Sequence, residues 1–270
     1  MILSEPMRLK GHYWVPVVLL ALAPILGLAV ERRPVKMAVS PPDCGLEVGY
    51  RQSDGDGRVE VYTVHAERIT VAGEPAYQSI SVYPDRVRRI TMRGRDLTPI
   101  AMTERWNNGR GMIQRTYRRG EVRMIRKNLP YPMDETIAVP AGVHDPESFA
   151  FLLRGYPFAE QDSIVPIDVL VAEPNPVYNK PIVLPVNIIP RGEERVTVPA
   201  GTFDCYVLSM GASGVLGYLL PENRFWLLKA EPHLIVKATA AGTTLELSAA
   251  PADCGDYQAR CKIRAETPPP

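Results

Sequence analysis

The sequence predicts a mainly β protein built from antiparallel strands, with one short helix near its middle. Two observations carry this prediction. Large parts of residues 46–127 and 196–249 alternate, or nearly alternate, apolar and polar side chains, as strands do when one face is buried and the other solvated. Only residues 145–154 carry clear helix signals. With 270 residues, 46% of them apolar, the chain is long enough for one large β domain with tails.

The N-terminus predicts export from the cytoplasm. Two basic residues precede an uncharged apolar stretch, residues 13–30, and Gly27 and Ala29 suit the −3 and −1 positions of cleavage after Ala29. The alternative is an uncleaved anchor, because this stretch is just long enough to span a bilayer. Either way we expect a periplasmic protein, or one anchored in the inner membrane and facing the periplasm. The expected segments are 1–29 signal peptide or anchor, 30–43 linker, 44–250 β domain and 251–270 C-terminal tail.

The chain has four cysteines, Cys44, Cys205, Cys254 and Cys261. An even number in an exported chain favours disulfides over metal binding or redox catalysis. The short spacing of Cys254 and Cys261 favours a small loop in the tail, which would leave Cys44 to pair with Cys205. Alternatively, Cys205 is a buried free thiol.

The first half of the domain predicts an antiparallel meander. Its turn signals include the segments 54–57 and Asn108-Gly109, and the second of these suits a tight hairpin. The expected strand regions are residues 58–64, 76–83, 86–94 and 111–125.

The middle of the domain predicts a helix and then irregular chain. Asp145 stands where an N-cap belongs, Pro146 suits the first helical position, and Gly155 and Pro157 end the helix. Residues 159–195 contain six prolines, which predicts extended edge segments and loops rather than central strands.

The last third returns to the strand pattern. In the segment 196–210, Pro199 and Gly201 predict a turn, because proline presets φ and glycine tolerates a positive φ. The expected strands are residues 196–198, 203–210, 224–228, 233–239 and 243–249.

These elements resemble a family of bacterial envelope proteins known only as a domain of unknown function. The shared pattern is a helix with Asp-x-x-Ser ending in Arg, a Gly-Thr-Phe turn, a strand with Trp and a closing Gly-x-x-Leu-x-Leu strand. Here the matching residues are Asp145, Ser148, Arg154, Gly201–Phe203, Trp226, Gly242, Leu245 and Leu247. The resemblance covers roughly residues 44–250. It implies a curved antiparallel sheet, similar to the open half-barrels of the lipoprotein-handling proteins LolA and LolB, with the helix packed in its concavity.

Residue patterns typical of enzymes are weak in this chain. The four histidines have no metal-ligand spacing, although His144 lies beside Asp145. The segment 211–214 lacks a nucleophile elbow, and the segment 54–57 fails as a calcium loop at its later ligand positions. We therefore expect no catalytic residues, no metal and no cofactor.

Charge is distributed unevenly along the chain. Residues 86–127 contain 13 basic and 3 acidic residues, whereas residues 128–204 contain 4 basic and 11 acidic residues. A solvated outer face explains the basic excess; the sharper interpretation is an anionic partner such as phospholipid headgroups or lipopolysaccharide. The arginines expected to form this face are Arg88, Arg93, Arg115, Arg119 and Arg123. The net charge of +1 gives no indication of nucleic-acid binding.

Two classes of function follow. The first is a non-catalytic binding or carrier-like protein of the envelope, whose partner is a lipid or a lipidated component held on the concave face. The second is a structural or assembly protein, whose concavity is filled by its own helix and whose basic face docks a partner at the membrane surface. The residues expected to line the ligand site are Phe149, Tyr206, Leu208, Phe225, Trp226, Ile235 and Val236.

Overall fold

The computed structural model describes residues 37, 46–159, 163–172, 181–213 and 222–249. All of them belong to one compact unit of the chain, Pro34–Pro270. The predicted signal segment, Cys44, Cys254 and Cys261 lie outside the described residues. None of the helices in the described ranges is long and apolar enough to cross a membrane.

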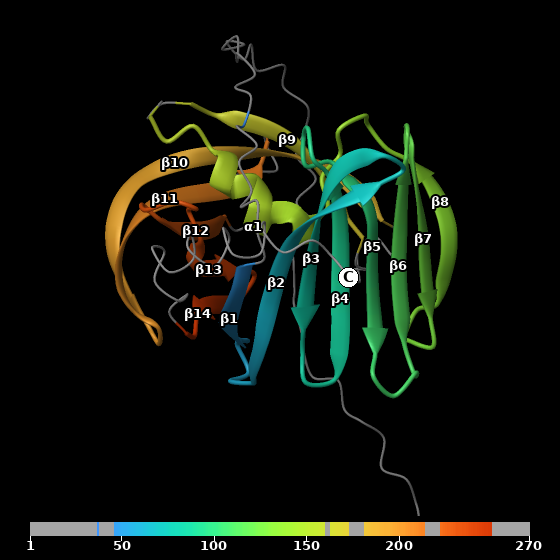
Figure 1. Ribbon diagram of the computed structural model, residues 1–270, viewed down its shortest axis with the longest axis horizontal. Coiled ribbons are helices and arrows are strands. Elements are labelled where there is room, and N and C mark those ends of the chain that lie inside the picture. Colours follow the sequence, from blue (N-terminus) through green and yellow to red (C-terminus); the bar gives the residue numbers. More distant parts are fainter. Residues whose placement is uncertain (1–36, 38–45, 160–162, 173–180, 214–221, 250–270) are drawn as a thin grey trace, which may run out of the picture. The chain divides into compact units, whose positions relative to one another are not determined.

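The first half of the fold is a meander of eight antiparallel strands (Figure 1). They are β1 (Leu46–Ser53), β2 (Val59–Val71), β3 (Glu74–Val82), β4 (Arg86–Arg93), β5 (Pro99–Trp106), β6 (Met112–Arg118), β7 (Glu121–Lys127) and β8 (Met133–Ala138). The predicted strand region 111–125 is two strands, because Arg119 and Gly120 form a turn in which Gly120 has a φ of +77°. The other expected regions of this half lie within single strands or extend them by one residue.

The second half is a meander of six strands. They are β9 (Val165–Val171), β10 (Ile182–Val198), β11 (Gly201–Ala212), β12 (Asn223–Leu228), β13 (Ile235–Ala240) and β14 (Thr243–Leu247). Antiparallel pairing of β1 with β14 joins the two meanders into one open 14-stranded sheet with β8 and β9 at its edges.

The corner at Pro199 confirms the predicted turn. Val198 pairs with Gly201 across the hairpin, which leaves Pro199 and Ala200 as its loop, and Gly201 has a φ of +136°. The expectation for the proline-rich segment holds only in part. β9 is an edge strand, but β10 lies between β9 and β11. β10 tolerates Pro190 because the pairing with β11 shifts register there, and Pro185 lies past the last residue that pairs with β11.

One helical segment connects the meanders and packs inside the curve of the sheet (Figure 1). It consists of the 3₁₀ turn η1 (Pro146–Ser148), α1 (Phe149–Leu152) and the 3₁₀ turn η2 (Leu153–Gly155). Phe149 and Leu152 pack against β9–β13, whereas Phe151 packs into a cluster that includes residues of β1–β5. The fold is therefore the predicted curved, open antiparallel sheet with a helix in its concavity.

Residues 139–145 connect the two edges of the sheet. Val139 N donates to Gly120 O (2.9 Å), His144 N donates to Asp168 O of β9 (2.8 Å), and Leu170 N donates to His144 O (2.9 Å). Leu170 also shares a buried cluster with residues of β6 and β7. The edge strands thus share a core even though they do not pair with each other as strands.

Candidate functional site: an arginine-lined pocket

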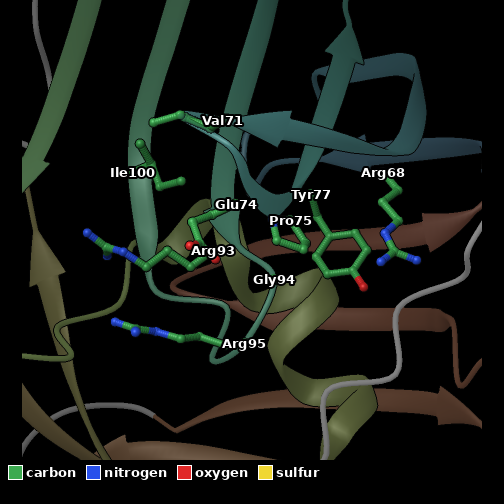
Figure 2. Close-up of a pocket in the computed structure, with 10 residues that line it drawn as sticks. Arg68, Val71, Glu74, Pro75, Tyr77, Arg93, Gly94, Arg95 and Ile100 are labelled. Atoms are coloured by element: carbon green, nitrogen blue, oxygen red, sulfur yellow. The ribbon is translucent and has the colours of Figure 1, made fainter.

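A pocket of about 750 Å³ opens at one end of the first meander (Figure 2). This volume lies within the range of roughly 300–1,000 Å³ that is usual for small-molecule sites. Three arginines and one carboxylate give the pocket its charge, and several apolar side chains complete it. The lining residues are Arg68, Val71, Ala72, Glu74, Pro75, Tyr77, Arg93, Gly94, Arg95 and Ile100.

Two neighbouring turns build the pocket. Ala72 and Gly73 have φ angles of +51° and +85°, so the β2–β3 hairpin closes with a two-residue loop. Alternate turns of an antiparallel meander lie at the same end of the sheet, which brings this hairpin beside the β4–β5 turn. In Figure 2 Arg93 and Arg95 extend in the same direction, with Tyr77 and Arg68 on the other side of the pocket.

Gly94 sets how closely the two turns approach. Gly94 N donates to Pro75 O (2.9 Å). A Cβ atom at position 94 would lie 2.8 Å from the same carbonyl oxygen, closer than side chains tolerate. A larger residue would therefore push the β4–β5 turn away from β3 and widen the pocket.

Hydrogen bonds within the turn hold Arg93. Arg93 Nη1 donates to Thr98 Oγ1 (2.9 Å) and lies 3.5 Å from Pro99 O. Thr98 N and Thr98 Oγ1 both donate to Asp96 Oδ1, at 3.0 Å and 2.6 Å. Burial acts to raise the pKa of Asp96, but the hydrogen bonds from Thr98 and Arg95 outweigh it and hold the pKa below its ordinary value. Asp96 is therefore an anion that organises this turn.

The five arginines expected to form one basic face do not all share a face. Arg88 bonds Glu147 Oε2 (2.6 Å) and Glu104 Oε2 (3.1 Å), inside the curve of the sheet. Arg115 is buried, and its Nη1 donates to both carboxylate oxygens of Asp145 at 3.0 Å.

Of the other three arginines, Arg93 and Arg119 line a common pocket, and Arg123 lies apart from them. Arg93 lines the pocket, and Arg119 lies in the β6–β7 turn. Arg123 is exposed and forms an ion pair with Asp134 at 3.1 Å. The pattern of basic residues along the strands does not predict that Arg88 and Arg115 turn inward. Their carboxylate partners come from another strand and from the helical segment.

Six of the seven residues expected to line a ligand site are part of the protein core. Five of them are buried in clusters with the helix or with neighbouring strands: Leu208, Phe225, Trp226, Ile235 and Val236. Phe149 projects from the helix itself and meets Phe225 edge-on, with ring centroids 6.5 Å apart. The helix thus fills the concave face at Leu208, Phe225 and Ile235, which share one buried cluster with Phe149 and Leu152.

Tyr206 is the exception among the seven. It is half-buried, stacks on Phe158 with ring centroids 4.2 Å apart, and lines a separate pocket of about 210 Å³.

Cys205 is a buried free thiol, and burial raises its pKa to about 11. Such a thiol is protonated and unreactive at neutral pH. In the part of the chain that the structure describes, no group of three or more His, Cys, Asp or Glu side chains is placed to hold a metal ion.

Three residues of the pocket, Arg68, Arg95 and Tyr77, were not among the expected site residues. A signal for the arginines was available, because an antiparallel meander places its alternate turns together and basic residues stand in or near three of them. These are Arg68 before the β2–β3 turn, Arg93 and Arg95 at the β4–β5 turn, and Arg118 and Arg119 at the β6–β7 turn.

Comparisons with known proteins place the chain in a family. A search of solved structures found the crystal structure of a beta-barrel-like protein of the domain of unknown function DUF1849 from Brucella abortus. The two chains are 9% identical, with a TM-score of 0.38 over 76% of this chain and 96% of that one. Curated proteins gave no significant match. The family described as protein of unknown function (DUF3108) matches residues 58–248. Since this match spans most of the chain, the protein belongs to the DUF3108 family.

Proposed function

We propose that this protein is a non-catalytic binding or carrier-like protein of the cell envelope, and that its ligand is an amphipathic molecule with an anionic group, such as a phospholipid. The observation that carries the proposal is the pocket of about 750 Å³ at the β2–β3 and β4–β5 turns. Its arginines and its apolar side chains line one continuous space.

The chemistry of the lining suits the two parts of such a ligand. The guanidinium groups of Arg68, Arg93 and Arg95 match phosphate or carboxylate oxygens in geometry and charge. Val71 and Ile100 offer apolar surface to the beginning of an acyl chain. The concave face is a weaker candidate, because Phe149 and Leu152 of the helix are themselves buried against the sheet.

An envelope location and a role like that of the LolA and LolB proteins belong to the same proposal. The uncharged stretch at residues 13–30 supports export. The open sheet with an internal helix supports a likeness to the half-barrels of LolA and LolB.

A displacement titration tests the proposed function. A fluorescent fatty acid is bound to the purified protein and displaced with dispersed phosphatidylglycerol. We expect saturable binding that Arg68→Gln weakens roughly tenfold, because one charge-assisted hydrogen bond is lost. The matched control is Arg89→Gln, since Arg89 is an exposed arginine of β4 away from the pocket. Equal affinities for these two variants, or no saturable binding by the wild type, would contradict the proposal.

A structural or assembly role is the second candidate. The filled concavity favours it, because a sheet whose inner face is covered by its own helix acts as a rigid scaffold. In that case the fatty acid would not bind, and native mass spectrometry of the purified protein would show no bound lipid.

A further inference from the structure

A second pocket adjoins the first at the same end of the sheet. It has a volume of about 430 Å³ and lies between the β4–β5 turn, the β6–β7 turn and residues 139–143. Arg93 and Arg95 line both pockets, so the two spaces meet at the β4–β5 turn.

The two pockets together concentrate positive charge. Their charged lining residues are five arginines and two carboxylates: Arg68, Arg93, Arg95, Arg118, Arg119, Glu74 and Asp96. One carboxylate, Asp96, is already engaged by Thr98 and Arg95. The nearest acidic partner of Arg118 is Glu121 at 4.0 Å, in an exposed pair that compensates little charge. Like charges gathered in this way repel one another, and an anion bound between them relieves that repulsion.

One anionic group accounts for only part of this arrangement. Arg68 lines only the first pocket and lies across it from Arg93 and Arg95 (Figure 2), whereas Arg118 and Arg119 line only the second pocket. We infer that the ligand carries two phosphate groups, one for each pocket, with Arg93 and Arg95 between them. This inference rests on the proposed function and specifies its ligand: an amphipathic lipid with a diphosphorylated headgroup.

Vesicle binding tests the inference. The probes are phosphatidylcholine vesicles that contain either cardiolipin, with two phosphates, or phosphatidylglycerol, with one, matched in total charge. We expect the wild type to prefer cardiolipin by roughly tenfold, as one further charge-assisted contact would give. Arg119→Gln should remove most of this preference. Arg68→Gln should weaken binding to both vesicles and keep the preference, and Arg89→Gln serves as the control.

The outcomes separate the inference from the function on which it rests. If the wild type shows no preference for cardiolipin, or if Arg119→Gln keeps that preference, the two-phosphate ligand is overturned. Binding to phosphatidylglycerol vesicles would then still support the proposed function. Failure of Arg68→Gln to weaken either interaction overturns the first pocket as a lipid site. Inorganic pyrophosphate should compete only weakly with the vesicles, because it brings no acyl chain. Competition as strong as that of cardiolipin would overturn a lipid as the source of the phosphates.

Discussion

His144 is buried where residues 139–145 meet the edge strand β9. Its side chain is 9% exposed, and its Nδ1 atom has no hydrogen-bond partner among the described residues. Burial lowers the pKa of His144, although the charges of Asp96 and Asp168 act to raise it. The imidazole is therefore neutral in the folded protein at neutral pH, and folding opposes its protonation.

Acidification should destabilise the protein through His144. The unfolded chain binds a proton at the ordinary histidine pKa of roughly 6.5, whereas the folded protein binds it only at lower pH. The free energy of unfolding should thus fall as the pH drops below that value, and the loss should end below the folded pKa. Chemical denaturation of the wild type and of His144→Gln checks this: the variant should lose less stability on acidification. His65→Gln, at a partly exposed position of β2, is the control. If the free energy of unfolding depends on pH in the same way in all three proteins, the role of His144 is refuted.

The helical segment depends on buried charge. Asp145 is fully buried, and its Oδ1 accepts from Glu147 N (3.0 Å), which caps the first turn. The same carboxylate accepts both bonds from Arg115 and a hydrogen bond from the Tyr117 hydroxyl. One residue therefore starts the helix and ties it to β6.

Removing this carboxylate should destabilise the fold strongly. Asp145→Ala removes the buried carboxylate that pairs with Arg115, which costs roughly 3–5 kcal/mol of unfolding free energy. Asp134→Ala is the matched control, because it breaks the exposed pair with Arg123, whose loss we expect to leave the free energy of unfolding almost unchanged. Urea denaturation measures the loss of unfolding free energy in each variant. The double variant Arg115→Met/Asp145→Ala should lose less unfolding free energy than the sum of the losses in Arg115→Met and in Asp145→Ala. Additive losses would mean that the pair is not coupled.

At the scale of the whole molecule, the pairing of β1 with β14 joins strands from the two ends of the domain. Tyr50 of β1 pairs with Leu247 of β14, and Tyr50 Oη donates to Ile235 O of β13 (3.1 Å). The loop of the β10–β11 hairpin also contacts the β1–β14 pair, because Ala200 N donates to Leu247 O (3.1 Å). Residues of both meanders therefore meet at the β1–β14 junction.

We expect the two meanders to unfold together. Leu247→Ala removes a side chain that is 1% exposed, at a cost of about 2–5 kcal/mol. Hydrogen exchange should show an equal loss of protection in peptides of β4 and of β12, while Val61→Ala, at an exposed position of β2, changes neither. Loss confined to β9–β14 would show that the halves fold independently.

The sequence by itself determined the local structure of this protein. Turn residues such as Gly109 and Pro199 mark hairpins because their φ preferences act within a few residues. The tight hairpin expected at Asn108-Gly109 is wrong in detail, because the last strand pair is Arg105 with Met112 and only Gly109 has a positive φ. The Asp145 cap and the alternation of the strands are likewise local, so the class of the fold and the place of its helix followed from them.

Tertiary structure alone decided the rest. The β1–β14 pairing joins segments almost 200 residues apart in the chain, and no local preference specifies it. Arg88 and Arg115 turn inward because Glu147 and Asp145, supplied by the helix, compensate their charge there. The arginine-lined pocket exists only because hairpin geometry brings alternate turns together. Alternation of side chains distinguishes the two faces of a strand, but which face becomes the interior depends on partners that the chain supplies from elsewhere.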